Sequence, residues 1–294
     1  MRVFRWFLFI APVLGGGLLA QAAPDAGAQN PLSKAEELYR RTDYRASLAL
    51  LRDSGPATGR AGYIAGRDYY MLGDYKRAAG EFERAFKMEP QNSELALWLG
   101  RSFGRRAETS GPFSSARCAS KARAYFEKAV ALDPQNQQAL DDLFDYYLEA
   151  PGFLGGGYGK AEGIAGSVGK QNPAEGRLAE ARLADRRKQF DTTEEHLRRA
   201  VDLAPLQVKR LLDLARYLAR QGQTAGSEAI FDKAERLAPK SPDITFARAQ
   251  TYIEQKRDLE RARALLNQYL QSHPAPGGPS RRQAQKLLKE ASGA

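Results

Sequence analysis

Small and aromatic residues alternate along residues 59–92 with the spacing of two amphipathic helices. The first helix carries Gly66 and Tyr69, and the second carries Ala78, Phe82 and Ala85. Small side chains allow two helices to approach closely, while aromatic side chains fill the space between them. Proline then ends the second helix, because it lacks a backbone N–H and cannot continue the helical ladder. This segment is therefore predicted to be a helical hairpin that ends at Pro90.

The same pattern returns along the chain, which indicates a repeat protein. Prolines equivalent to the first one close each unit: Pro90, Pro134, Pro173, Pro205, Pro239 and Pro274. Before each later proline, two mostly small residues occupy the offsets of Ala78 and Ala85: Ala122 and Ala129, Ala161 and Val168, Thr193 and Ala200, Ser227 and Ala234, and Ala262 and Tyr269. A period near 34 residues is typical of stacked helix pairs that cannot bury their apolar faces alone.

This pattern resembles the tetratricopeptide repeat, whose units carry Leu-Gly, Tyr, Ala, Phe, Ala and Pro at fixed offsets. The resemblance implies an all-α, right-handed superhelical solenoid of antiparallel helix pairs, with about seven repeats and a C-terminal capping helix. It also implies a non-enzymatic scaffold for protein–protein interaction. Two intervals between the prolines are longer than the period, and we interpret residues 104–118 and 149–159 as loop insertions within the third and fourth repeats.

The two ends of the array differ from the central repeats. Residues 32–58 are predicted to form a degenerate first repeat, and residues 59–274 the regular solenoid. Residues 275–294 are predicted to form a linker and a capping helix. Ser280 and Gln283 have the spacing of a capping box, ahead of an apolar face that comprises Ala284, Leu287, Leu288 and Ala291.

The N-terminus has the pattern of a cleavable export signal in residues 1–22. Arg2 and Arg5 flank an apolar run that is shorter than the roughly 20 residues needed to span a bilayer, and Ala20-Gln21-Ala22 supplies a small-x-small cleavage site. Residues 23–31 are then a flexible linker. We expect export to the periplasm, with secretion as the alternative. Cys118 is the single cysteine, so no intramolecular disulfide is possible, and we expect it to be a small, partly buried residue.

The charge lies mainly in the C-terminal part. The formal net charge is +10, and residues 174–294 contain 23 basic and 16 acidic side chains, a net of +7. A basic half suits an acidic protein or peptide partner, and the alternative is a basic adhesion module for anionic lipid headgroups or an anionic envelope polymer. A further alternative is a structural subunit of an envelope assembly. An exported protein rarely meets nucleic acid, so we expect no nucleic-acid partner.

In the repeat family, the first helices of successive units line a binding groove. By this resemblance, six arginines point into it: Arg67, Arg101, Arg182, Arg186, Arg216 and Arg220. The resemblance also places apolar and aromatic side chains there: Tyr63, Tyr70, Leu97, Leu178, Leu212 and Phe246. Such a surface suits a peptide with carboxylates, which arginine engages through two parallel hydrogen bonds. The alternative is that these arginines simply cover a solvated face.

Trp98 also falls toward the groove, either as a ligand contact or as packing beneath the following segment. On the predicted first helix of the fourth repeat, Asp141, Asp142 and Asp145 form an acidic cluster. We expect pairing with Arg101, Arg105 or Arg106 rather than metal binding, because the spacing is not that of a calcium loop.

The sequence offers no catalytic constellation. Lys160 follows glycines, but Leu154 and Ala161 occupy positions where a phosphate loop needs Gly and Ser or Thr. Gly163, Gly166 and Gly169 instead suggest close helix approach. His196 and His273 are isolated from other ligand residues. We therefore expect no catalytic residue, no cofactor and no metal.

Overall fold

The structure is a computed structural model that describes residues 30–53, 59–272 and 279–293. These residues divide into two compact units, with the division after Ile164. The predicted export signal and nearly all of the predicted linker lie outside the described residues, as do His273 and Pro274. Every regular element in the described ranges is helical.

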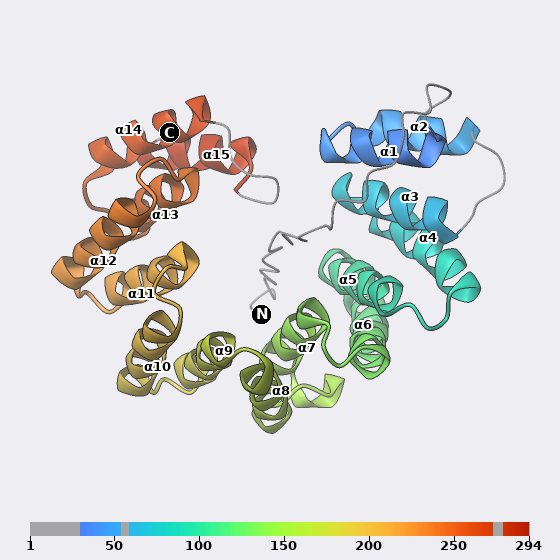
Figure 1. Cartoon of the computed structure of the whole chain (residues 1–294), viewed down its shortest axis with the longest axis horizontal. Coiled ribbons are helices and arrows are strands. Elements are labelled where there is room, and N and C mark those ends of the chain that lie inside the picture. The colour runs from blue at the N-terminus through green and yellow to red at the C-terminus, as the bar shows by residue number, and fades with distance from the viewer. Residues whose placement is uncertain (1–29, 54–58, 273–278, 294) are drawn as a thin grey trace, which may run out of the picture. The chain divides into compact units, whose positions relative to one another are not determined.

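Both units consist of helices, and the connections that the structure describes between them are short (Figure 1). The first unit contains α1 (Pro31–Arg40), α2 (Tyr44–Asp53), α3 (Gly59–Met71), α4 (Tyr75–Met88), α5 (Ser93–Thr109), α6 (Pro112–Leu132), α7 (Gln137–Glu149), the 3-10 turn η1 (Gly152–Leu154) and the start of α8 (Tyr158–Gln171). After the end of α8, the second unit contains α9 (Pro173–Arg186), α10 (Phe190–Leu203), α11 (Val208–Arg220), α12 (Thr224–Leu237), α13 (Pro242–Glu254), α14 (Leu259–Gln271) and α15 (Arg281–Ala291). The described chain therefore holds seven successive helix pairs and a final cap, which confirms the predicted solenoid.

In the second and third repeats, the two helices meet where a glycine faces an aromatic ring. A Cβ atom at Gly66 on α3 would stand 2.6 Å from a ring carbon of Phe82 on α4. Gly100 on α5 faces Phe126 on α6 in the same way, at an even shorter distance. Both rings are buried, so only glycine fits at these two positions.

The register positions predicted for small residues on the second helices are all buried, from Ala78 and Ala85 to Ala262. The last of these positions, which holds Tyr269, is buried as well. In two repeats serine takes the place of the first alanine and adds a bond between the paired helices. Ser47 Oγ donates to Ala35 O (3.1 Å), and Ser227 Oγ donates to Ala215 O (2.8 Å). Tyr69, predicted to fill the same interface as Phe82, is only half-buried.

The C-terminal cap forms as predicted. The Ser280 hydroxyl accepts from the Gln283 backbone N–H (3.2 Å), and the Gln283 side chain accepts from the Ser280 N–H (2.6 Å). Ala284 and Ala291 are buried, and Ala284 belongs to the core around Tyr269. The capping helix therefore covers the apolar end of the last repeat.

Residues 104–118 are not a loop, so that prediction was wrong. They continue α5 and begin α6, and only Ser110 and Gly111 lie outside a helix. Helix-favouring residues around Arg105 extend the first helix, and Pro112 occupies the first turn of the second, where its missing N–H costs nothing. Cys118 is consequently a buried helical residue.

The segment 149–159 does contain a connection, with η1 in its middle. The prediction that three glycines of α8 flatten a helix contact holds for only one of them. Gly169 lies against Gly176 on α9, whereas a Cβ atom at Gly163 or Gly166 would meet nothing within 4 Å.

Asp68 on α3 is a buried carboxylate at the contact between the first two repeats. Its side chain is inaccessible to solvent, and no ion pair reaches it from the described residues. Burial raises the pKa of Asp68 to about 7, and neighbouring Ser47 and Arg67 oppose the shift only in part.

We predict that Asp68→Asn removes a pH-dependent loss of stability. The folded carboxyl keeps its proton up to about pH 7, whereas an unfolded Asp loses its proton near pH 4, so the wild-type protein should lose stability between these values, by at most about 4 kcal/mol. Chemical denaturation followed by circular dichroism at pH 4.5 and pH 8 checks this. Asp68→Asn should be more stable than wild type at pH 8 and similar at pH 4.5. Asp53→Asn, at an exposed site, is the control, and equal pH profiles for wild type and Asp68→Asn would contradict the prediction.

Candidate functional site

Arg67, the first of the predicted groove arginines, is surrounded by rings. Its guanidinium carbon lies 4.0 Å from the ring centroid of Tyr39, 5.2 Å from that of Tyr63 and 5.5 Å from that of Trp98. It also donates to the Tyr63 hydroxyl (3.3 Å). The Tyr63 hydroxyl in turn donates to the carboxylate of Glu94 on α5. The charge of Arg67 is thus engaged within the first unit.

Trp98 packs in the core, but against rings of the preceding helices α3 and α4 and not beneath the following segment as the packing alternative had it. The side chain is 6% exposed and stacks on Phe82 with a centroid distance of 5.8 Å. Tyr70 meets it edge-on at 5.3 Å and is also buried. Neither Trp98 nor Tyr70 is available to a ligand, because Tyr70 and Phe82 cover Trp98, and Tyr75 and Trp98 cover Tyr70.

Arg101 is also a buried structural residue, which corrects its assignment to the groove. Its Nε donates to Asp142 Oδ2 on α7 (2.5 Å), and its terminal nitrogen donates to Gln138 (3.1 Å). The side chains of Arg101 and Asp142 are 7% and 6% exposed. Burial raises the pKa of Asp142, and Arg101 opposes that shift. The expected pairing of the acidic cluster with Arg101 is confirmed for Asp142.

In the second unit, Leu212 and Phe246 were wrongly predicted to line the groove. Leu212 belongs to the core formed by α9 to α13, and Phe246 packs on Tyr269 with ring centroids 5.1 Å apart. Leu97 of the first unit is buried as well, and Leu178 is partly buried against the same core as Leu212. Repeat register gives the direction of a side chain, but the bulk of the next repeat decides whether solvent reaches it.

Four predicted arginines remain accessible in the second unit. Arg186 on α9 and Arg220 on α11 are exposed, while Arg182 and Arg216 are half-buried. Arg220 lies 3.6 Å from Asp185 of α9, so these parts of α9 and α11 are neighbours on the surface. Burial raises the pKa of Asp213, and the cations Lys209, Arg210 and Arg216 oppose this shift only in part. We call the surface formed by Arg182, Arg186, Arg216 and Arg220 the arginine face.

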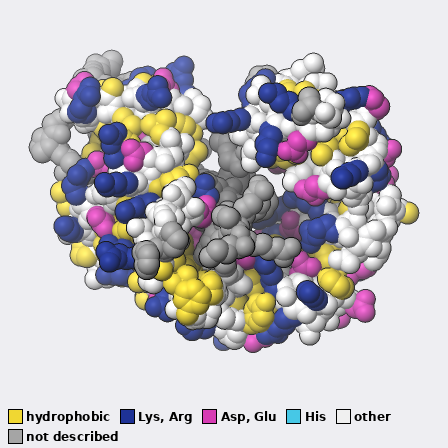
Figure 2. Space-filling view, turned by 180° about the vertical axis from the view of Figure 1, so that it is seen from behind, with side chains coloured by type: hydrophobic (Ala, Val, Ile, Leu, Met, Phe, Trp, Pro, Cys, Tyr) yellow, Lys and Arg dark blue, Asp and Glu magenta, His cyan; other side chains and the backbone are white. Residues whose placement is uncertain are grey.

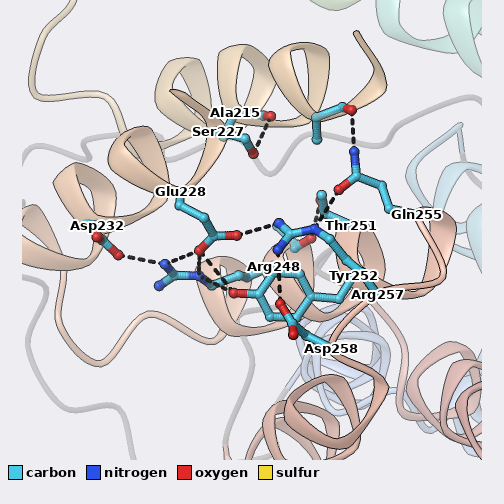
Figure 3. Close-up of polar contacts among 12 residues, drawn as sticks. Ala215, Ser227, Glu228, Asp232, Arg248, Thr251, Tyr252, Gln255, Arg257 and Asp258 are labelled. Atoms are coloured by element: carbon cyan, nitrogen blue, oxygen red, sulfur yellow. Dashed lines mark hydrogen bonds and ion pairs between the residues drawn. The ribbon is translucent and has the colours of Figure 1, made fainter. Parts of the chain in front are cut away.

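Arg248 on α13 was not predicted, although it forms the densest charge network among the described residues (Figure 3). It is 4% exposed and contacts Glu228 (2.5 Å), Asp232 (2.6 Å) and Glu235 (3.0 Å) of α12. Arg257 also binds Glu228 (2.5 Å). The signal in the sequence is the spacing of the three carboxylates, which places them on one helical face.

Arg210 on α11 is the other buried arginine that the sequence did not reveal. It is 2% exposed and pairs with Glu175 of α9 and with Asp213 (3.4 Å). It anchors the helices that carry the arginine face. The arrangement around Arg210 and Arg248 is therefore structural support, not a ligand surface.

Within the described ranges, no group of three or more His, Cys, Asp or Glu side chains is arranged to hold a metal ion. In the same part of the chain, no helix has the length and hydropathy to cross a membrane.

The comparison with protein families finds a tetratricopeptide-repeat model that matches residues 63–106, 178–242 and 212–279. Among solved structures, a tetratricopeptide repeat protein from Parabacteroides merdae superposes with a TM-score of 0.61 and 16% identity, over 89% of this chain and 97% of that one. The Thermus thermophilus protein TTC0263, a thermophilic TPR protein, gives a TM-score of 0.51 and 19% identity, over 64% and 97%. No curated protein matches the chain in sequence.

We predict that Arg101→Met destabilises the protein by about 3–5 kcal/mol, because Asp142 stays buried without its partner and must either remain charged in an apolar site or take up a proton. The double variant Arg101→Met, Asp142→Leu should recover most of this loss, since both charges are then absent. Urea denaturation at pH 7 followed by circular dichroism measures both changes. Arg84→Met, which removes an exposed arginine paired with Glu81, is the control and should cost less than about 1 kcal/mol. A double variant no more stable than the single one would refute the argument.

Proposed function

Because the chain carries tetratricopeptide repeats and shares the fold of that family, we propose that it is a non-enzymatic scaffold that binds an acidic segment of a partner protein on the arginine face. Proteins of this family generally mediate protein–protein interactions. The single observation that carries the proposal is the accessibility of the arginines on α9 and α11. Arg101 is buried against Asp142 in the first unit, whereas Arg182 and Arg216, at the same register position, are half-buried. Arg186 and Arg220, one turn further along, are exposed.

The ion pair between Arg220 and Asp185 is one that a partner can replace. The two side chains are 55% and 39% exposed, and exposed pairs of this kind contribute only about 0–1 kcal/mol. A partner carboxylate that makes two parallel hydrogen bonds to Arg220 would bind more strongly than Asp185 does at 3.6 Å. Binding therefore requires little loss of internal stabilisation.

The spacing of the arginines favours an extended partner segment. Arg182 and Arg186 are four residues apart on α9, and Arg216 and Arg220 are four apart on α11, which corresponds to a rise of about 6 Å along each helix. Alternate residues of an extended chain are about 6.6–6.8 Å apart. Carboxylates on alternate residues would therefore meet successive arginines, and the net charge of +7 in residues 174–294 would attract such a segment.

We also propose that the scaffold acts in the cell envelope. The pattern of residues 1–22, with two arginines, an apolar run and Ala20-Gln21-Ala22, supports this.

We predict that the exported protein begins at Ala23. The small residues before it fit signal peptidase cleavage. Fractionation of the native cells and mass measurement of the N-terminal peptide test this. Recovery of the chain with Met1 intact in the cytosol would contradict it.

We predict that changing Arg182, Arg186, Arg216 and Arg220 together to Glu strongly weakens binding of acidic peptides. The probe is a labelled ten-residue peptide that alternates Glu with Leu, and fluorescence anisotropy measures its affinity. Affinity should fall by at least about tenfold, because each arginine loses a charge-assisted contact. Circular dichroism verifies folding of the variant.

The matched control changes four exposed basic residues of the second unit outside the arginine face: Arg199, Lys233, Arg236 and Lys240. It alters the net charge equally and should retain affinity within about threefold. Equal losses in both variants would instead indicate diffuse adhesion to anionic material. Binding of the wild-type protein to anionic lipid vesicles without binding the peptide would exclude the proposed partner class.

A further inference from the structure

The connection between α7 and α8 displays the most exposed large apolar side chain of the described residues. Phe153 in η1 is 84% exposed. Tyr158, at the start of α8, is 42% exposed. Figure 2 shows apolar side chains gathered at the lower edge of the view, in the region of η1 and α8. Full burial of a Phe side chain would contribute about 1.5–3 kcal/mol, a stabilisation that this segment does not use within the described chain.

Hydrogen bonds hold this connection in one shape. The Tyr146 hydroxyl donates to Leu154 O (2.9 Å), and the Gly157 N–H donates to Tyr147 O (2.8 Å). Within the turn, the Gly155 N–H donates to Gly152 O (2.8 Å). Two buried tyrosines of α7 thus fix both ends of the glycine run, so Phe153 is presented by an ordered backbone.

The glycines of the connection are required by its geometry. Gly155 and Gly157 have φ angles of +86° and +147°, which residues with a Cβ atom rarely adopt. Gly156 has no unusual φ, but a Cβ atom there would collide with Ala150 O. The turn that exposes Phe153 therefore requires glycine at three consecutive positions.

Two cations flank the turn. Lys160 Nζ donates to Gly155 O (3.0 Å), and the Arg123 guanidinium lies against Gly155. Glu127, the nearest acidic residue of α6, accepts from the Tyr147 hydroxyl (2.8 Å) and lies 3.8 Å from Arg123. Glu162 is two residues beyond Lys160, about 200° around the helix. Glu149, the last residue of α7, is half-buried. The two charged side chains that contact the backbone of the turn, Lys160 and Arg123, are both cations.

We propose that residues 150–158 form a second docking surface, which inserts Phe153 into an apolar pocket flanked by carboxylates on a partner protein. An ordered aromatic residue loses little conformational entropy on binding, and single aromatic anchors dominate many protein interfaces. Lys160 and Arg123 would form ion pairs with the carboxylates of the partner. This surface lies in the first unit and does not depend on the arginine face of the second.

The test places the photocrosslinking residue p-benzoylphenylalanine at position 153 of the full chain in its native cells. The matched probe replaces Leu206, which is 78% exposed in the second unit. The expected result is an adduct with one protein from position 153 that is absent from position 206. The crosslinked peptide of that protein should contain apolar residues and Asp or Glu.

The identified partner is then purified, and its affinity for the full chain is measured by calorimetry. Phe153→Ser and Lys160→Glu should each weaken binding by at least about tenfold, while Leu206→Ser leaves it unchanged. Gly156→Ala keeps Phe153 but displaces the turn, and should weaken binding as well. Circular dichroism verifies that each variant is folded.

Several outcomes would overturn the proposal. These are the absence of an adduct specific to position 153, an adduct with lipid or with a second copy of this chain, or unchanged affinity in Phe153→Ser. Loss of the adduct on changing the four residues of the arginine face would show that the two surfaces form one site.

Discussion

The fold depends on the close approach of the two helices within each repeat. Gly66 against Phe82 and Gly100 against Phe126 show how this is achieved, because a ring on the second helix occupies the volume that a side chain on the first would need. Each such contact buries a large aromatic surface at nearly crystalline packing density. A single pair of helices cannot cover the remaining apolar faces, so the stacking of further repeats and the cap α15 follow from this one constraint.

Between repeats, buried arginines add selectivity to apolar packing. Arg101 pairs with Asp142 across α5 and α7, Arg210 with Glu175 across α9 and α11, and Arg248 with Glu228 across α12 and α13. Repeats with similar apolar faces could pack beside a wrong neighbour with little loss of apolar contact. A wrong order would leave a buried charge without its partner, which costs several kcal/mol. The ion pairs therefore contribute more to the choice of neighbour than to net stability.

The sequence predicts the helix pairs well because their determinants are local and periodic. Ala122 and Ala129, and their counterparts in each later repeat, are buried as the register requires. The capping box at Ser280 is equally local. The turn at Ser110 and Gly111 was misread as a long loop, since helix-breaking residues mark where a helix can end but not how far its neighbours extend.

The candidate site was less predictable, because exposure depends on contacts between repeats. Arg101 and Arg216 share a register position, yet the first meets a carboxylate at 2.5 Å and is buried, whereas the second is half-buried on an accessible face. What distinguishes them is the residue supplied by the next repeat: Asp142 and Gln138 reach Arg101 from α7. This chain therefore buries one register position in an ion pair in the first unit and leaves the same position partly accessible in the second. The function of each arginine is decided by its neighbour rather than by its place in the repeat.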